Sequence, residues 1–378
     1  LWTWELVSPV SGCLTSHLLV LCERLTRSDG VARVMTQQEV AAIPEDGILL
    51  HVGVHKSGTT SLQEALRRRK RKLSDNSVIY QGPVLAGWGR LSADFDPQPS
   101  DDDAGNALLR RISEHPGRVI ISSEFLCTAT FEQAAHWLQL LPTGRPVTVM
   151  VTVRSLADLL PSSWQETVKG PTTRYGGKTF ETWLREVFAD SGHARNAFWK
   201  RNNYPRILKR WGRAAGQSNV IFVVADKSDK ERLHRVTERL LALPDGLLPQ
   251  MPRSNQSISY QEAELFRRVK LSAGEGYSTP EILAVRKGMR AATRQQDLSG
   301  DRIPVPQWAA DEVGPIAEEF ARALLASQAS IVGRIEDIAL PGTPPAAHDE
   351  PPESVDLRLA AAAALGALRE LRETESQE

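Results

Sequence analysis

The sequence predicts an α/β fold, in which a central parallel sheet is flanked by helices on both faces. Short apolar runs alternate with segments of helical spacing from Gly47 onward. The chain has 378 residues, of which 41% are hydrophobic, so it can bury one large core or two smaller ones. We therefore expect one α/β domain over residues 35–340.

The predicted elements follow one another at short intervals. Runs rich in β-branched residues predict strands, and the strongest of them ends at Val153. Strands are expected at residues 48–54, 118–122, 146–153 and 219–225. An apolar face recurring every three or four residues predicts helices, as at Leu62, Ala65 and Leu66. Helices are expected at residues 59–69, 104–114, 131–141, 156–168, 180–187, 204–214 and 230–241, and residues 257–327 are expected to be mostly helical.

The two ends of the chain differ from this pattern. Residues 1–34 resemble no targeting segment, and the short apolar run at residues 18–22 cannot span a membrane. We expect residues 1–34 to be a non-native or disordered extension, with translation beginning at Met35. Five prolines mark residues 341–378 as a linker followed by an Ala-rich helix at residues 357–371. That helix is either a loosely docked or frayed tail or a partner-binding helix.

Charge and cysteine content exclude several classes of protein. The chain carries 46 basic and 46 acidic side chains, so we expect no nucleic-acid partner and no general attraction to anionic membranes. Its three cysteines, Cys13, Cys22 and Cys127, lack the spacing of a zinc site or a disulfide framework. We expect no metal and a cytoplasmic location.

The most informative segment runs from His51 to Leu62. A strand leads into a turn rich in glycine and hydroxyl groups, and a helix begins directly afterwards. Backbone N–H groups at a helix start are unpaired and carry the positive end of the helix dipole, so they bind phosphate or sulfate. Lys56 adds a full positive charge, and Ser57, Thr59 and Thr60 add hydroxyl donors. Gly58 allows an anion to approach the backbone closely.

A nucleoside-triphosphatase loop is the main alternative for this segment. Gly53 and Gly58 have the separation of that motif, but Thr59 stands where it requires lysine. Asp226, which follows a strand, is the nearest candidate for a magnesium ligand, and we interpret it as an ordinary residue at a strand end. The loop therefore suits an anion without an obligatory metal.

The run from Lys56 to Thr60, placed between a strand and a helix, resembles the 5′-phosphosulfate loop of sulfotransferases that use 3′-phosphoadenosine 5′-phosphosulfate (PAPS). The longer string from His55 to Gln63 is especially similar to the bacterial branch of that family, whose fold is of the P-loop-containing nucleotide-binding type. The resemblance implies that Lys56 contacts the bridging oxygen and the leaving phosphate. It also implies that Ser57, Gly58, Thr59, Thr60 and Ser61 hold the 5′-phosphate. Animal members carry a stacking tryptophan at the position of Ser61, so adenine must stack elsewhere here.

A second anion site is expected at Arg154, which follows the strand over residues 146–153. Ser162 comes eight residues later in the next predicted helix, and this pair resembles the 3′-phosphate site of the same family. A planar guanidinium can hold two phosphate oxygens. Ser163 is the neighbouring alternative, about 100° further round an ideal helix. Together, the two sites would distinguish PAPS, which carries phosphate at both the 5′ and the 3′ position of the ribose, from ATP, which has no 3′-phosphate.

The resemblance also implies a catalytic base. Glu124 follows the strand over residues 118–122, at the position where the family carries histidine or glutamate. Ser122 and Ser123 are possible assistants, and His51 and His55 are alternative bases. The expected reaction is transfer of the sulfuryl group to a hydroxyl or amine of a small-molecule or glycan acceptor. A P-loop nucleotide kinase and a non-catalytic nucleotide-binding module are the alternatives.

Three further features have structural interpretations. The basic run at residues 67–72 closes a helix, where cations complement the dipole, so we expect a solvated face. Four tryptophans in helical patterns are expected to lie in the core: Trp164, Trp183, Trp199 and Trp211. Residues 169–178 have the composition of a loop that could cover an acceptor pocket.

Overall fold

The computed structural model describes residues 32–81, 103–170, 176–226, 228–250, 258–273, 279–295, 301–342, 344–347 and 351–375. The chain divides into two compact units. Unit 1 comprises Leu1–Leu156, Arg201–Arg253 and Gly314–Leu340, and unit 2 comprises Ala157–Lys200, Ser254–Val313 and Pro341–Glu378. The expected domain over residues 35–340 extends over both units, and its boundaries stay a prediction.

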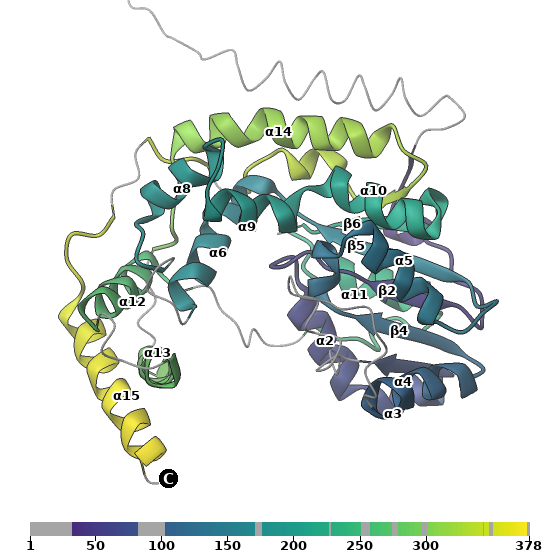
Figure 1. The fold of residues 1–378 in the computed structure, drawn as a ribbon, viewed down its shortest axis with the longest axis horizontal. Coiled ribbons are helices and arrows are strands. Elements are labelled where there is room, and N and C mark those ends of the chain that lie inside the picture. The colour runs from purple at the N-terminus through teal and green to yellow at the C-terminus, as the bar shows by residue number, and fades with distance from the viewer. Residues whose placement is uncertain are drawn as a thin grey trace, which may run out of the picture. The chain divides into compact units, whose positions relative to one another are not determined.

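Unit 1 contains a seven-stranded sheet in the order β1-β7-β6-β5-β2-β4-β3, and every neighbouring pair is parallel (Figure 1). The strands are β1 (Arg33–Met35), β2 (Ile48–His51), β3 (Val78–Gln81), β4 (Arg118–Ser122), β5 (Val147–Val153), β6 (Val220–Val224) and β7 (Ser330–Val332). The predicted α/β class with a parallel sheet is confirmed. Strands β1, β3 and β7 were not predicted, because each is short and, unlike β2, does not continue into a longer apolar run.

Helices cover both faces of this sheet. On one face, Leu49, Met150 and Val223 belong to a core cluster that also contains apolar residues of α2 (Thr59–Arg68), α3 (Lys70–Asp75) and α11 (Arg232–Leu240). On the other side, α10 (Tyr204–Ala215) contacts β5, β6 and α5 (Phe131–Leu140). The remaining elements of this unit are η1 (Gln37–Glu39), α4 (Asp103–Glu114), η3 (Glu124–Thr128), η4 (Gln217–Asn219) and η5 (Ile335–Ile338). Burial on both faces explains why the strands are almost wholly apolar.

Unit 2 is helical and has an aromatic core. Its helices include most of α6 (Leu156–Lys169) and α9 (His193–Asn202), the start of α14 (Gln307–Leu325), and α8 (Phe180–Phe188), α12 (Tyr260–Ala273), α13 (Thr279–Gln295) and α15 (Leu357–Glu375). Trp164 packs against Phe180 with ring centroids 5.3 Å apart and meets Tyr260 edge-on at 5.9 Å. Trp183 meets Phe198 edge-on at 6.0 Å. Trp164 and Trp183 are buried as expected, whereas Trp199 is only half-buried.

The two chain ends depart from the expectation. Arg33 and Val34, assigned above to an extension, form part of β1 and pair with β7, because backbone groups there complete the sheet edge. Residues 1–31 lie outside the described residues. The Ala-rich helix α15 packs closely on α13, where a Cβ on Gly288 would lie within 2.0 Å of the carbonyl oxygen of Gly366. The C-terminal helix is therefore docked within unit 2 and not frayed.

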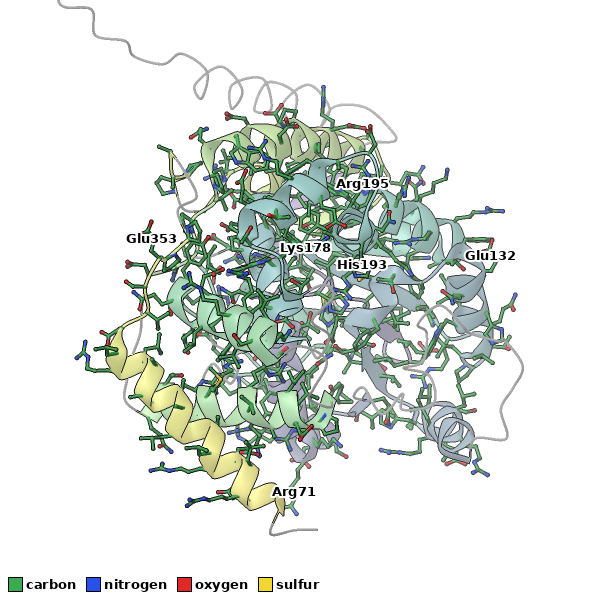
Figure 2. All side chains as sticks on the ribbon, turned by 60° about the vertical axis from the view of Figure 1, so that its left-hand side comes forward. Arg71, Glu132, Lys178, His193, Arg195 and Glu353 are labelled. Carbon is green, nitrogen blue, oxygen red and sulfur yellow. The ribbon has the colours of Figure 1, made fainter. Side chains whose placement is uncertain are left out.

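The basic run at residues 67–72, which spans the end of α2 and the start of α3, forms a mostly exposed face of unit 1. Arg67 and Arg68 both donate hydrogen bonds to Glu64 and remain largely exposed. Arg71, labelled in Figure 2, is also exposed. Hydrogen bonds from Arg67 and Arg68 lower the pKa of Glu64 to about 2. These contacts agree with the solvated-face interpretation of the run.

Candidate functional site

The glycine- and hydroxyl-rich loop follows β2, an inner strand that lies between β4 and β5 in the sheet. After β2 the chain forms β3 and β4, which lie on one side of β2 within the sheet. It then crosses to β5, the neighbour of β2 on the other side. Open α/β sheets bind ligands outside the carboxyl ends of the strands at such a reversal. Pairing with β5 continues into the loop, since Val52 N–H donates to Met150 and Val54 N–H donates to Thr152.

Three residues of this loop adopt positive φ angles. Gly53 has φ 83° and Gly58 has φ 101°, a region that favours glycine. Lys56 has φ 64°, although a residue with a Cβ pays an energetic cost in the left-handed region. Such strain in the backbone is concentrated at functional sites. Gly58 opens α2, and no side chain of the described residues caps this helix start, so the amides there suit an anion.

The hydroxyl groups of the loop differ in their hydrogen-bond partners, and their expected contact with a phosphate stays a prediction. Ser57 Oγ and Thr59 Oγ1 both donate to the carbonyl oxygen of Val54, at 2.7 and 3.2 Å. These two side chains therefore stabilise the turn itself, and a ligand would meet the backbone amides of the two residues. Thr60 is exposed. Ser61 Oγ lies 3.2 Å from Nε2 of His234.

Arg154 lies beside this loop. Its Nη1 donates to the carbonyl oxygen of Lys56 at 2.9 Å. The hydroxyl of buried Tyr204 donates to the carbonyl oxygen of Arg154 at 2.7 Å, which fixes the backbone at the end of β5. Burial raises the pKa of Tyr204, so the hydroxyl stays protonated as the donor. The structure thus brings the first predicted anion site and the arginine of the second together.

Glu124 lies on the opposite flank of the loop, at the start of η3 after β4. A Cβ on Gly53 would lie 2.8 Å from the Cα of Glu124, so the glycine lets the two segments touch. Gln63, on α2, donates from Nε2 to Oε2 of Glu124 at 3.0 Å. The same amide lies 3.3 Å from Ser122 Oγ. The amide therefore orients one carboxylate oxygen of the candidate base.

His51 is packed in the strand and does not face solvent. Its Nδ1 lies 2.9 Å from Ser122 Oγ and its Nε2 lies 2.8 Å from Thr152 Oγ1. The side chain is fully buried, and this burial lowers its pKa to about 3. A neutral imidazole held between two hydroxyls suits a structural role better than that of a base. The other alternative, His55, meets the half-exposed ring of Phe125 edge-on at 5.2 Å.

Ser162 and Ser163 lie in α6, within unit 2. Ser162 Oγ donates to the carbonyl oxygen of Asp158 at 3.2 Å, one turn earlier in the helix. The expectation that Ser162 joins Arg154 at a phosphate stays a prediction. Of the expected covering loop, residues 171–175 lie outside the described residues.

Two contributors to this region were missed or dismissed from the sequence. Gln63 was noted only as the end of the motif string, yet it holds Glu124. The sequence did not single out His234, which accepts from Ser61 while its Nδ1 lies 2.9 Å from the carbonyl oxygen of Leu248. Because that carbonyl can only accept, the proton of neutral His234 is on Nδ1 and Ser61 is the donor to Nε2. A lone histidine in a helix carries no sequence signal for this contact.

Asp226 behaves as the ordinary residue expected at a strand end. Its Oδ1 accepts from the backbone and hydroxyl of Ser228, both at 2.7 Å, and Oδ2 accepts from Arg232 at 3.0 Å. Burial alone would raise the pKa of Asp226, but the hydrogen bonds and the charge of Arg232 outweigh it and lower the pKa. Both oxygens are thus engaged by local partners.

No family model matches the chain, and no curated protein matches it. Among solved structures, the crystal structure of a sulfotransferase from Alicyclobacillus acidocaldarius is similar, with a TM-score of 0.38 and 15% sequence identity. The match covers 61% of this chain and 94% of that chain. Within the part of the chain that the structure describes, no helix has the length and apolar character needed to cross a membrane.

Proposed function

We propose that this chain is a sulfotransferase that takes PAPS as its donor and transfers the sulfuryl group to a hydroxyl or amine of a small-molecule or glycan acceptor. The observation that carries the proposal is the 2.9 Å hydrogen bond from Arg154 to the carbonyl of Lys56. It joins two cationic segments that lie 98 residues apart at the carboxyl ends of adjacent strands. A nucleotide with anionic groups at both ends matches such a pair.

In this proposal each side chain has a physical task. Lys56 and the amides of residues 57–61 hold the 5′-phosphosulfate, and Arg154 with Ser162 holds the 3′-phosphate. Guanidinium suits phosphate because its planar fork stays charged and donates two parallel hydrogen bonds. Glu124, positioned by Gln63, accepts the proton of the acceptor.

The proposed reaction is an in-line displacement at sulfur. The acceptor oxygen or nitrogen loses its proton to Glu124 and forms the new bond to sulfur. The bond from sulfur to the bridging oxygen breaks, and its electron pair remains on the nucleotide phosphate. Lys56 and the loop amides oppose the negative charge that develops there, and one such donor contributes roughly 10²–10³ in rate. The scheme assigns no step to a metal. We also propose a cytoplasmic location, because the three cysteines lack the spacing of a disulfide framework.

The test is incubation of the purified chain with labelled PAPS, EDTA and a panel of cell extracts. Mass spectrometry should detect products heavier by roughly 80 Da, the mass of an added sulfuryl group. Turnover that requires ATP and Mg²⁺ would instead indicate a nucleotide kinase. Binding of the product nucleotide PAP with no product, and no effect of Lys56→Ala or Glu124→Ala on any rate, would indicate a non-catalytic module.

A further inference from the structure

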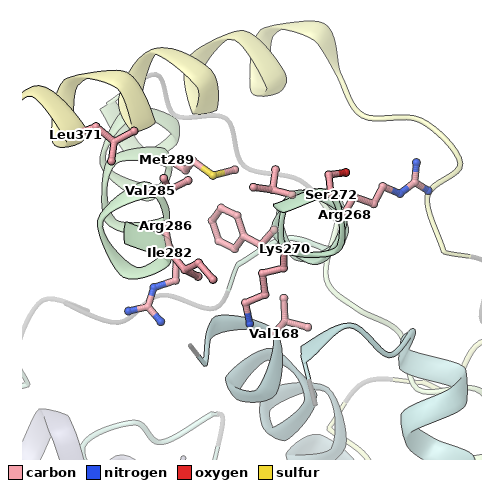
Figure 3. Close-up of a pocket in the computed structure, with 11 residues that line it drawn as sticks. Val168, Arg268, Lys270, Ser272, Ile282, Val285, Arg286, Met289 and Leu371 are labelled. Carbon is pink, nitrogen blue, oxygen red and sulfur yellow. The ribbon is translucent and has the colours of Figure 1, made fainter. Parts of the chain in front are cut away.

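Unit 2 contains a cavity of about 470 Å³ that the proposed transfer reaction does not use (Figure 3). It lies among α12, α13, α15 and the end of α6. The walls are mainly apolar, and seven aliphatic, aromatic or thioether side chains supply them: Val168, Phe266, Val269, Ile282, Val285, Met289 and Leu371. Its volume lies in the range of small-molecule sites.

Three cations also line this cavity. Arg268 lies near the carboxylate of Glu264 and donates to the carbonyl oxygens of Pro352 and Glu353, whereas Lys270 and Arg286 have their contacts at one end of the cavity. The ammonium of Lys270 lies 3.4 Å from the carbonyl oxygen of Thr167, and Arg286 donates to the carbonyl oxygen of Lys169. Figure 3 shows the Lys270 side chain reaching toward Val168 on α6, whereas Met289 and Leu371 lie on the side of α13 and α15. The cavity therefore has one cationic end and one apolar end.

The burial of Lys270 is unusual for a lysine. The residue is only 5% exposed, and its Nζ occupies the space that a Cβ on Gly176 would fill, 2.5 Å away. Burial, and next the charge of Arg286, lowers the pKa of Lys270 to about 8. Within the described residues, the polar contacts of Lys270 and Arg286 are to backbone carbonyls and no ion pair joins them to a carboxylate.

An anion at this end of the cavity would offset both the burial of the Lys270 ammonium and its repulsion by Arg286. A buried ammonium is unfavourable unless an opposite charge or good hydrogen bonds offset the loss of water. One negative group between Lys270 and Arg286 would pair with both of them at once. The contacts to the last carbonyls of α6 resemble ordinary capping of a helix C-terminus. Capping alone does not require an apolar cavity beside the cations.

We propose that unit 2 binds a small carboxylate amphiphile in this cavity. The carboxylate lies on Lys270 and Arg286, and the apolar tail packs against Phe266 and its neighbours. This inference does not depend on the proposed sulfuryl transfer. It concerns a different unit and different side chains.

The first experiment compares three probes of equal chain length. Dodecanoate, dodecanol and dodecyltrimethylammonium are titrated into the full chain by calorimetry, below their micelle-forming concentrations. Dodecanoate should bind with a stoichiometry of one and about tenfold or more tighter than dodecanol, because a charge-assisted contact is lost in the alcohol. The cationic probe should bind weakest. Equal affinity for all three probes, or no binding of dodecanoate, would overturn the proposal.

The second experiment uses variants of the full chain. Lys270→Met keeps the aliphatic stem and removes the charge, so dodecanoate affinity should fall about tenfold or more while dodecanol affinity stays the same. Lys287→Met is the matched control, since Lys287 is largely exposed on α13 and pairs with Glu370. If Lys270→Met does not fold, Arg286→Met tests the same headgroup contact. Unchanged dodecanoate affinity in a folded variant would leave helix capping as the role of these cations.

Discussion

The guanidinium of Arg154 donates a hydrogen bond to the carbonyl oxygen of Lys56 at 2.9 Å. The bond ties the end of β5 to the loop after β2, and these strands are neighbours in the sheet. Lys56 adopts φ 64° at this point, so the hydrogen bond helps to hold a backbone conformation that a lysine disfavours. The bond thereby keeps the Arg154 side chain against the loop that carries Lys56.

Substitution of Arg154 should weaken the binding of a nucleotide that has a 3′-phosphate more than that of one without it. In Arg154→Lys the charge remains but the planar fork is lost, so PAP affinity should fall about ten- to a hundredfold. Adenosine 5′-phosphate lacks the 3′-phosphate and should lose less affinity. Calorimetric titration of both ligands measures the difference. Arg71→Ala, on the exposed basic run, is the control, and equal losses for both ligands would show that Arg154 only supports the loop.

Lys56→Gly should lower activity without lowering stability. Glycine accepts φ 64° without a steric cost, so the free energy of unfolding should stay the same or rise by up to about 1 kcal/mol. The lost ammonium should reduce turnover with PAPS by roughly 10²–10³. Urea unfolding and single-turnover rates check the two effects. Full activity in the variant would remove Lys56 from the proposed mechanism.

Gln63→Leu should affect the chemical step more than nucleotide binding. The substitution removes the 3.0 Å hydrogen bond that holds Oε2 of Glu124 and leaves the side chain similar in volume. We expect kcat to fall about tenfold, the effect of one oriented hydrogen bond, with the KM for PAPS unchanged. Gln328→Leu, an exposed glutamine in the same unit, is the control. A rise in KM without loss of kcat would contradict a positioning role for Gln63.

Much of the fold was predictable because the buried strands carry a strong local signal. The apolar runs at β2, β4, β5 and β6 are long enough to show that both faces are covered, and their order along the chain implied a parallel sheet. Strands β3 and β7 have little local pattern and exist because neighbouring strands pair with them. Their prediction would need tertiary information.

The candidate site was predictable only where one segment supplies the chemistry. The composition of the loop around Lys56 predicts an anion site, and the position of Arg154 directly after a strand predicts a second one. The contact of Gln63 with Glu124 and that of His234 with Ser61 join segments 61 and 173 residues apart, so no local pattern encodes them. The sequence does not show that the hydroxyls of Ser57 and Thr59 both donate to the carbonyl of Val54 within the same turn, and their expected contact with a ligand stays a prediction.

Gly53→Ala tests how closely the loop must approach Glu124. The variant combines an unfavourable φ of 83° with a Cβ that would lie 2.8 Å from the Cα of Glu124. Gly144→Ala has nearly the same backbone penalty, with φ 88°, but no atom within 4 Å of the added carbon. We expect a cost of about 1–2 kcal/mol for Gly144→Ala and at least about 1 kcal/mol more for Gly53→Ala. Urea unfolding of both variants gives the difference, and equal costs would show that the contact is easily relaxed.

His51 should make the stability of the protein depend on pH in the acid range. Burial lowers the pKa of His51 to about 3 in the folded chain, whereas an unfolded histidine titrates near 6.5. Between these values the unfolded chain binds more protons, so stability is fully present above about pH 6.5 and is lost as the pH falls toward 3. One group of this kind contributes a slope of about 1 kcal/mol per pH unit.

His51→Gln keeps a side chain that can hydrogen bond to Ser122 or Thr152 but removes the titration. The slope of the unfolding free energy between pH 6 and 4 should therefore decrease by about 1 kcal/mol per pH unit relative to the unaltered protein. Buried His234, whose pKa burial also lowers, and the carboxylates contribute equally to both proteins, so the difference isolates His51. The exposed His193→Gln variant should keep the full slope. An unchanged slope in His51→Gln would mean that protonated His51 is accommodated between its two hydroxyl partners, and the imidazole would then return as a candidate for proton transfer beside the loop.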